Sequence, residues 1–144
     1  MIAVDANILV YAHRGESAWH EPAANVMRQL AEGRSSWAVP WPCVHEFLAI
    51  VTHPRIYAPP STMDQAMDQV EAWLESPSLV MLSEGDMHLE TLRRTLGNSK
   101  MLGPQVHDAR VAALCLQHGV TELWTADRDF QRIADLHTRN PLVD

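Results

Sequence analysis

The chain has 144 residues, of which 47% are hydrophobic and 20% are charged, and this composition predicts one folded domain over residues 1–144. The 11 Lys and Arg against 18 Asp and Glu give a net charge of −7, which excludes a global basic field that would attract RNA or an anionic membrane. The two cysteines show no CxxC spacing, which excludes a disulfide framework and a thiolate metal site, so we expect a cytoplasmic protein without membrane contact.

Short apolar strands and amphipathic helices alternate along the first half of the chain. In chain order, the pattern predicts a strand at 1–4, helical turns at 7–12, a helix at 20–31, a strand at 36–39, a helix at 44–51, a loop at 55–61 and a helix at 63–74. Gly33 is placed to end the second of these helices, and Thr62 to cap the last one.

The second half continues the same alternation. The pattern predicts a strand at 78–82, a helix at 86–96, a polar loop at 97–104, a helix at 106–118, a strand at 122–125 and a short helix at 126–130. Strands that alternate with helices favour an α/β fold, in which a central, mostly parallel sheet of four or five strands is flanked by helices.

Four carboxylates are predicted to meet at one edge of this sheet. Asp5 and Asp127 follow the first and last predicted strands, and ligands of parallel sheets bind at the carboxyl ends of strands. Glu46 and Asp108 lie in helices that begin at the same edge. Because like charges raise one another's pKa, a divalent cation is implied, and Mg²⁺ or Mn²⁺ among oxygen ligands can supply the water for phosphodiester hydrolysis.

Each of these acids also has a structural interpretation. Asp5 and Asp127 can form turns at strand ends, Asp108 suits the first turn of a helix, and Glu46 can be a solvated helix residue. For Glu46 and Asp108 taken singly, the structural role is the commoner one. An acid that directly follows an apolar strand favours a function, and two such acids favour it more.

Several motifs in this order resemble the PIN domain. They are Asp5-Ala6-Asn7, Glu46, His107-Asp108-Ala109, Thr125-Ala126-Asp127-Arg128-Asp129-Phe130 and Asn140-Pro141. The stretch Val51-Thr52-His53-Pro54-Arg55-Ile56-Tyr57 further resembles one branch of the VapC toxins of bacterial toxin–antitoxin pairs. The resemblance implies a PIN-like three-layer sandwich and a Mg²⁺- or Mn²⁺-dependent endoribonuclease. It also implies a small VapB-type antitoxin as inhibitor and pairing of two chains in a homodimer.

The resemblance implies that the catalytic, metal-binding residues of the family correspond to the same four acids in this chain: Asp5, Glu46, Asp108 and Asp127. Three further polar residues are accessory candidates. Thr125 and Asp129 match accessory polar positions of the family, and Asp129 can either hold metal-bound waters or cap the last helix. Asn7 can hydrogen-bond Asp5 or act as a helix cap.

Contacts to RNA phosphates are predicted for basic residues around the acids. Arg93, Arg94 and Lys100 flank the loop that leads to Asp108, and Arg128 is next to Asp127. For Arg93 and Arg94, a solvated helix charge is an equal alternative. Arginine binds phosphate with two parallel hydrogen bonds, so the excess of arginine over lysine agrees with such contacts.

Two other functions remain open at this point. A haloacid-dehalogenase-like phosphatase also places an Asp after its first strand, but it needs a second Asp where this chain has Asn7. A non-catalytic module that binds RNA or protein would keep the fold and lose the activity. A zinc-protease HExxH motif is excluded, because Ala49 replaces the second histidine.

Large apolar side chains are expected mainly in the core. Met63, Met67 and Trp73 form a stripe on one predicted helix, and a partner groove is the alternative. The tryptophans at 19, 37 and 41 can also stack on unpaired bases, although tryptophan fills cores more often.

Overall fold

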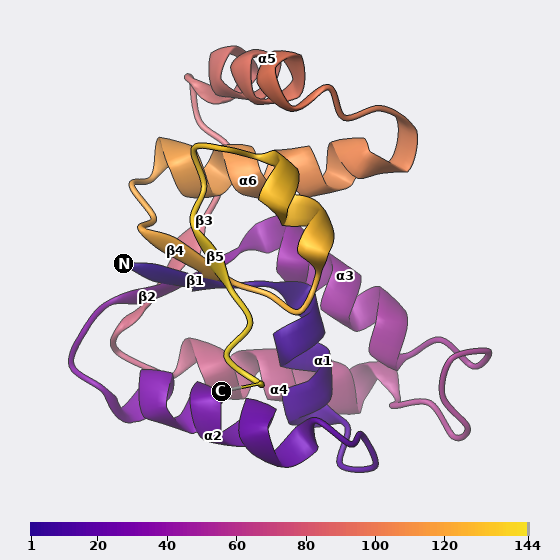
Figure 1. Ribbon diagram of the computed structural model, residues 1–144. Coiled ribbons are helices and arrows are strands. Elements are labelled where there is room, and N and C mark those ends of the chain that lie inside the picture. The colour runs from indigo at the N-terminus through magenta and orange to yellow at the C-terminus, as the bar shows by residue number, and fades with distance from the viewer. Residues whose placement is uncertain (144) are drawn as a thin grey trace.

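A five-stranded sheet lies at the centre of the computed structural model, which describes residues 1–143 (Figure 1). All strand pairs are parallel, in the order β3-β2-β1-β4-β5. The strands are β1 (Ile2–Val4), β2 (Trp37–Pro40), β3 (Leu79–Leu82), β4 (Glu122–Trp124) and β5 (Thr138–Arg139). The predicted α/β class with a mostly parallel sheet is confirmed. Asp144, the last residue of the predicted domain, lies outside the described residues.

Helices cover both faces of the sheet. They are α1 (Ala6–His13), α2 (His20–Glu32), α3 (Trp41–Val51), α4 (Met63–Leu74), α5 (His88–Ser99) and α6 (Val106–Gln117), with 3₁₀ turns η1 (Gly103–Gln105) and η2 (Arg128–Arg132). Figure 1 shows α5 and α6 on one side of the sheet and α2 and α4 on the other. The arrangement is the three-layer sandwich that the sequence predicts.

Local capping signals act as the sequence indicates. The side chain of Thr62 accepts a hydrogen bond from the backbone N–H of Gln65 at 3.1 Å, and the Gln65 side chain accepts one from the N–H of Thr62 at 2.9 Å. This reciprocal pair satisfies two free donors at the start of α4. Gly119 has a φ of +71°, a conformation that glycine adopts without strain, and it follows the end of α6.

Several predicted boundaries are wrong, among them the start of the loop at 97–104 and the start of the helix at 44–51. The predicted loop 97–104 begins too early, because α5 continues to Ser99 and Lys100 ends it in the left-handed conformation. The buried face that α5 presents to α6, with Thr91 and Thr95, outweighs the weak helix propensity of Gly97. α3 begins at Trp41 instead of Val44, since proline is tolerated in the first helical turn.

Strand β5 is not predicted by the sequence pattern. It has two residues, paired with Leu123 and Trp124 of β4, and no hydrophobic alternation can develop over so short a span. The last predicted helix is also different: it is the 3₁₀ turn η2, which begins at Arg128 and not at Ala126.

Some of the large apolar residues are buried and others are exposed, and the sequence does not predict which. Trp37 is fully buried, as expected, whereas Trp19 and Trp41 are exposed. The core assignment of Met63 and Met67 is wrong, because both side chains are exposed on α4. Within the described residues, every helix is too short or too polar to cross a lipid bilayer.

Candidate active site

The first acid, Asp5, is positioned by the pairing of β1 with β4. Val4 is in register with Trp124, and the N–H of Asp5 donates to the carbonyl of Trp124 at 3.0 Å. The Asp5 carboxylate caps α1 through a 2.8 Å bond from the N–H of Ala6. Because the two strands are parallel and adjacent, the loop after β4 begins next to Asp5.

A buried hydrogen-bond network holds the Asp5 carboxylate in place. The hydroxyl of Thr125 donates to Asp5 Oδ2 at 2.7 Å, and Asn7 Nδ2 donates to the same oxygen at 3.3 Å. The Thr125 oxygen accepts from the N–H of Asp127 at 3.0 Å, and Asn7 Oδ1 accepts from the N–H of Ala126 at 3.2 Å. Asn7 therefore bonds Asp5 and also ties α1 to the loop after β4.

The pKa of Asp5 is raised, even though its hydrogen bonds favour the ionised form. Burial is the largest cause, and the Asp5 residue is only 5% exposed. The bonds from Thr125, Ala6 and the Cys43 thiol lower the pKa, while the charge of Asp127 raises it. A buried carboxylate that is stabilised from one side gains from a cation placed on the other.

Replacing Thr125 by Val is expected to lower the activity of this site by about 10- to 100-fold, as is usual for residues that orient a metal-binding group. Valine has a similar shape but lacks the hydroxyl that donates to Asp5 and accepts from Asp127. The measurement is the rate of the RNA cleavage that the resemblance to PIN domains implies, at saturating Mn²⁺, with Thr125→Ser as the control that restores the hydroxyl. Full activity in the valine variant would contradict this role.

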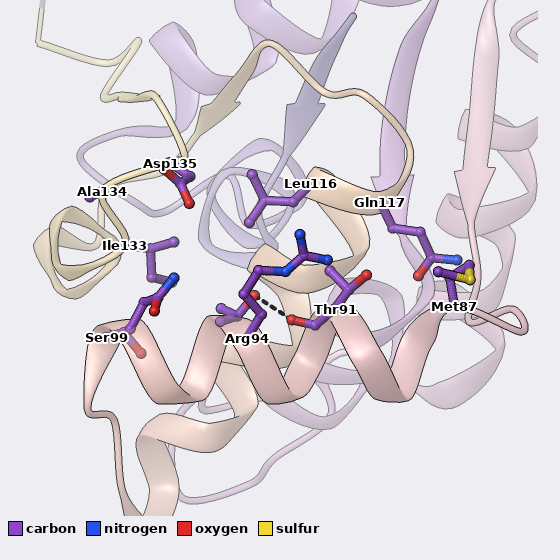
Figure 2. A pocket seen from close by; sticks show the side chains of 11 residues that line it. Met87, Thr91, Arg94, Ser99, Leu116, Gln117, Ile133, Ala134 and Asp135 are labelled. Carbon is purple, nitrogen blue, oxygen red and sulfur yellow. Dashed lines mark hydrogen bonds between the residues drawn. The ribbon is translucent and has the colours of Figure 1, made fainter.

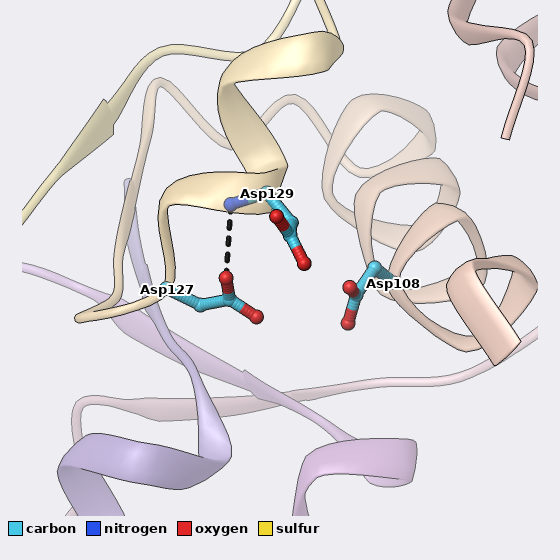
Figure 3. A group of neighbouring side chains, drawn as sticks. All are labelled: Asp108, Asp127 and Asp129. Atoms are coloured by element: carbon cyan, nitrogen blue, oxygen red, sulfur yellow. Dashed lines mark hydrogen bonds between the residues drawn. The ribbon is translucent and has the colours of Figure 1, made fainter.

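Three aspartates from different elements converge beside Asp5. Asp108 comes from the first turn of α6, Asp127 from the loop after β4, and Asp129 from η2. One carboxylate oxygen from each lies within 4.8 Å of the others, and Figure 3 shows the three groups facing a common space. Asp127 accepts from the N–H of Asp129 at 2.9 Å, so Asp127 is the cap of η2 and the Asp129 carboxylate is left for the cluster.

Mutual repulsion in this cluster is visible in the pKa of Asp108, which is raised to about 6. Partial burial is the largest cause, followed by the charges of Asp127, Asp5 and Asp129. Glu46 is not a member of the three-residue group, but its pKa is raised by burial and then by Asp5, Asp108 and Asp127. All four predicted acids therefore lie within one electrostatic field, together with Asp129.

The Asp108→Asn variant is expected to be more stable than the natural protein when no metal is bound. The pKa of Asp108 is raised, so its ionised form destabilises the folded state above pH 6, and this cost disappears as the pH falls toward 4. The gain at pH 7.5 is on the order of 1 kcal/mol, since partial hydration weakens the effect.

Urea unfolding in EDTA at pH 7.5 and pH 4 measures this gain in stability. The matched control is Asp86→Asn, which changes an exposed aspartate in the segment before α5. An Asp108→Asn variant that is destabilised at pH 7.5 would show that the carboxylate has a structural partner instead.

A pocket of about 460 Å³ adjoins the acids on the side of Glu46. His45 and Glu46 of α3 form one wall, and His107, Asp108 and Arg110 of α6 form the other. Sequence reasoning missed Arg110 as a candidate, although it is two residues beyond Asp108. Its Nε donates to Glu84 at 3.0 Å, and Glu84 itself is not among the residues that line the pocket.

The four basic residues predicted to contact RNA do not line this pocket. Arg94 instead lines a separate cavity of about 700 Å³ between α5, α6 and the segment after η2, and Figure 2 shows its guanidinium directed into that cavity. Arg93 and Lys100 are exposed on and after α5. Arg128 is also exposed and is the first residue of η2, next to Asp127.

The donor set of the cluster fits a hard divalent cation. It consists of carboxylate oxygens from Asp108, Asp127 and Asp129, the ligand type that Mg²⁺ and Mn²⁺ prefer. The two cysteines are buried, and burial raises the pKa of both thiols, that of Cys115 to about 12. They are therefore neutral and unsuited to hold zinc as thiolates.

Comparison with known proteins agrees with the fold and covers nearly the whole chain. The family model described as "PIN domain" matches residues 2–136. Ribonuclease VapC43 of Mycobacterium tuberculosis is 32% identical over 142 residues, covering 99% of this chain and 96% of the relative. Ribonuclease VapC33 of the same organism is 32% identical over 152 residues, covering 99% of each chain.

Solved structures of similar fold include toxin–antitoxin complexes. A chain of VapBC2 from Rickettsia felis, bound to a DNA fragment from its promoter, has a TM-score of 0.69 at 17% identity and covers 96% of this chain and 98% of that one. A chain of VapBC-1 from nontypeable Haemophilus influenzae has a TM-score of 0.65 at 20% identity and covers 98% of both chains. At these identities the likeness concerns the fold.

Proposed function

This chain belongs to the PIN-domain family, and from that premise we propose that it is an endoribonuclease that hydrolyses RNA phosphodiester bonds with Mg²⁺ or Mn²⁺. The observation that best supports this proposal is the convergence of Asp108, Asp127 and Asp129, with Asp5 and Glu46 close enough to interact electrostatically with the same site. Incubation of the purified protein with RNA, with and without Mn²⁺, tests the activity directly.

The metal would be held by the aspartate cluster together with Asp5, with Glu46 on the side of the pocket. When bound, the ion supplies charge neutralisation for the phosphate and activation of a water. Asp108 must be ionised to take part, and a bound cation would favour the ionised form against the burial and the neighbouring charges that raise its pKa. Thr125 and Asn7 orient Asp5 through hydrogen bonds, so they act as positioning residues.

The two alternative functions are not favoured. The phosphatase alternative needs an acid at position 7, where the side chain of Asn7 is committed to Asp5, Thr125 and Ala126. Its fold family is also not the one that matches the chain. A non-catalytic module would have no need for five acids in one electrostatic field, which costs stability without a cation.

We infer that the protein acts in the cytoplasm as the toxin of a type II toxin–antitoxin pair, inhibited by a small VapB-type antitoxin and assembled as a homodimer. The similar solved structures include VapBC complexes, and relatives that are 32% identical are named as VapC ribonucleases. Exposed apolar side chains on α4, including Met63, Met67 and Leu74, are available for such protein contacts.

Phosphate binding by the exposed basic residues gives a further prediction. Arg128→Ala is expected to weaken RNA binding and to reduce the salt slope of the affinity by about one, because one phosphate contact is lost next to Asp127. The combined alanine variant of Arg93, Arg94 and Lys100 is expected to act in the same direction.

The control for both variants is Arg34→Ala, since Arg34 precedes β2 at the opposite edge of the sheet. RNA affinity is measured at several salt concentrations. An unchanged affinity and salt slope in the combined variant would show that the residues at the end of α5 do not contact RNA.

A further inference from the structure

Trp41 is an exposed tryptophan at the same edge of the sheet as the acids. It follows Pro40, the last residue of β2, and it is the first residue of α3. Its side chain is 36% exposed, although an indole gains much from burial in the core. Trp41 stacks on the imidazole of His45 one turn further along, with ring centroids 6.3 Å apart and planes 26° apart.

One member of the stacked pair, His45, lines the pocket next to the acids, and Trp41 lies one helical turn before it on α3. His45 lines this pocket together with Glu46 and Asp108, so the pocket opens onto the proposed metal site. Its volume of about 460 Å³ falls within the range of roughly 300–1,000 Å³ that is typical of small-ligand sites. A group attached to a phosphate at the acids can therefore reach both the pocket and the two rings.

The chemistry of this surface suits a nucleobase. Trp41 and His45 offer ring faces for stacking, and Arg110 and His107 offer hydrogen-bond donors from the opposite wall. The ion pair with Glu84 uses Nε of Arg110, so its terminal amino groups take no part in that bond. Arginine amino groups in this arrangement recognise acceptor atoms on base edges.

We propose that single-stranded RNA crosses the Trp41–His45 pair with its bases stacked on the two rings, next to the phosphate held at the acids. This inference rests on the proposed ribonuclease function and assigns the side chains that would hold the bases next to the cleaved phosphate. Bases of a duplex stack on one another and do not offer a free face. Stacking would also add to the affinity of a chain with a net charge of −7 for a polyanion, because it requires no basic side chain.

The test compares Trp41→Ala and Trp41→Phe with the natural protein in cleavage of a short unpaired RNA and of the same sequence within a duplex. The alanine variant is expected to raise KM for the unpaired RNA by about tenfold, while kcat changes less than about twofold. Phenylalanine keeps a ring and is expected to restore most of the affinity. The duplex is expected to be a poor substrate for all three proteins.

The matched control is Trp19→Ala, which removes the second exposed tryptophan. Trp19 is 42% exposed and lies between α1 and α2, away from the sheet edge at which α1 begins. Its loss is expected to leave KM unchanged. An unchanged KM in Trp41→Ala would overturn the proposal, and so would equal cleavage of the duplex.

Binding measurements separate this inference from the proposed activity. Fluorescence anisotropy of a labelled single-stranded RNA with the Asp108→Asn protein reports affinity without cleavage. A natural protein that cleaves no RNA would overturn the ribonuclease, whereas an affinity that depends on Trp41 and not on Trp19 would still support the stacking surface. If light scattering shows that Trp41→Ala separates paired chains and KM stays unchanged, the exposed indole belongs to an interface between copies and the proposal fails.

Discussion

Replacing Asp108 by Asn is expected to lower RNA cleavage by more than about 100-fold, because the loss of an oxygen ligand exceeds the 10- to 100-fold effect of removing a group that only orients one. Asparagine keeps the size of the side chain but removes the negative charge that faces Asp127 and Asp129. The same variant is expected to be more stable without metal, so lost activity cannot be assigned to unfolding.

The measurement is the single-turnover cleavage rate at saturating RNA and Mn²⁺, with circular dichroism to verify the fold. Asp5→Asn is expected to be equally inactive, but less stable, because its amide would face the donor Nδ2 of Asn7. Asp86→Asn again provides the control. An Asp108→Asn protein that cleaves RNA at the natural rate would refute the assignment of the metal site.

Removal of divalent cations is expected to abolish cleavage completely, and addition of Mg²⁺ or Mn²⁺ is expected to restore it. One carboxylate oxygen each from Asp108, Asp127 and Asp129 lies within 4.8 Å of the others, and a bound cation would relieve the repulsion that raises the pKa of Asp108. The expected result in EDTA is therefore background cleavage only. Calcium, which takes more ligands in a looser geometry, serves as the comparison cation.

The pH dependence of metal binding follows from the same pKa. The carboxyl of Asp108 is protonated below about pH 6 and then cannot bind a cation, so the Mn²⁺ concentration needed for half-maximal activity should rise as the pH falls through 6. Isothermal titration with Mn²⁺ at pH 5 and pH 7.5 checks this directly. Full cleavage in EDTA at pH 7.5 would rule out the metal mechanism.

The sequence alone determined the fold class and the edge of the sheet at which the acids would gather. Buried parallel strands are continuously apolar, and helices show a period of about 3.6 residues, so both are visible in a single chain. Asp5 and Asp127 directly follow such strands, and their neighbourhood follows from the parallel arrangement. Thr62 as a helix cap is a local signal that involves four consecutive residues, and it was equally predictable.

Only the tertiary structure decided which side chains complete the site. Asp129 joins the cluster because Asp127 takes over the capping of η2, a choice between two neighbours that the sequence leaves open. Arg110 lines the same pocket as Glu46 because α6 packs beside α3, and the spacing along one helix does not predict which helix lies next to it. Periodicity shows which face of a helix is apolar, but burial depends on what covers that face. For this reason Trp37 is buried while Trp41, four residues later, is exposed at the proposed site.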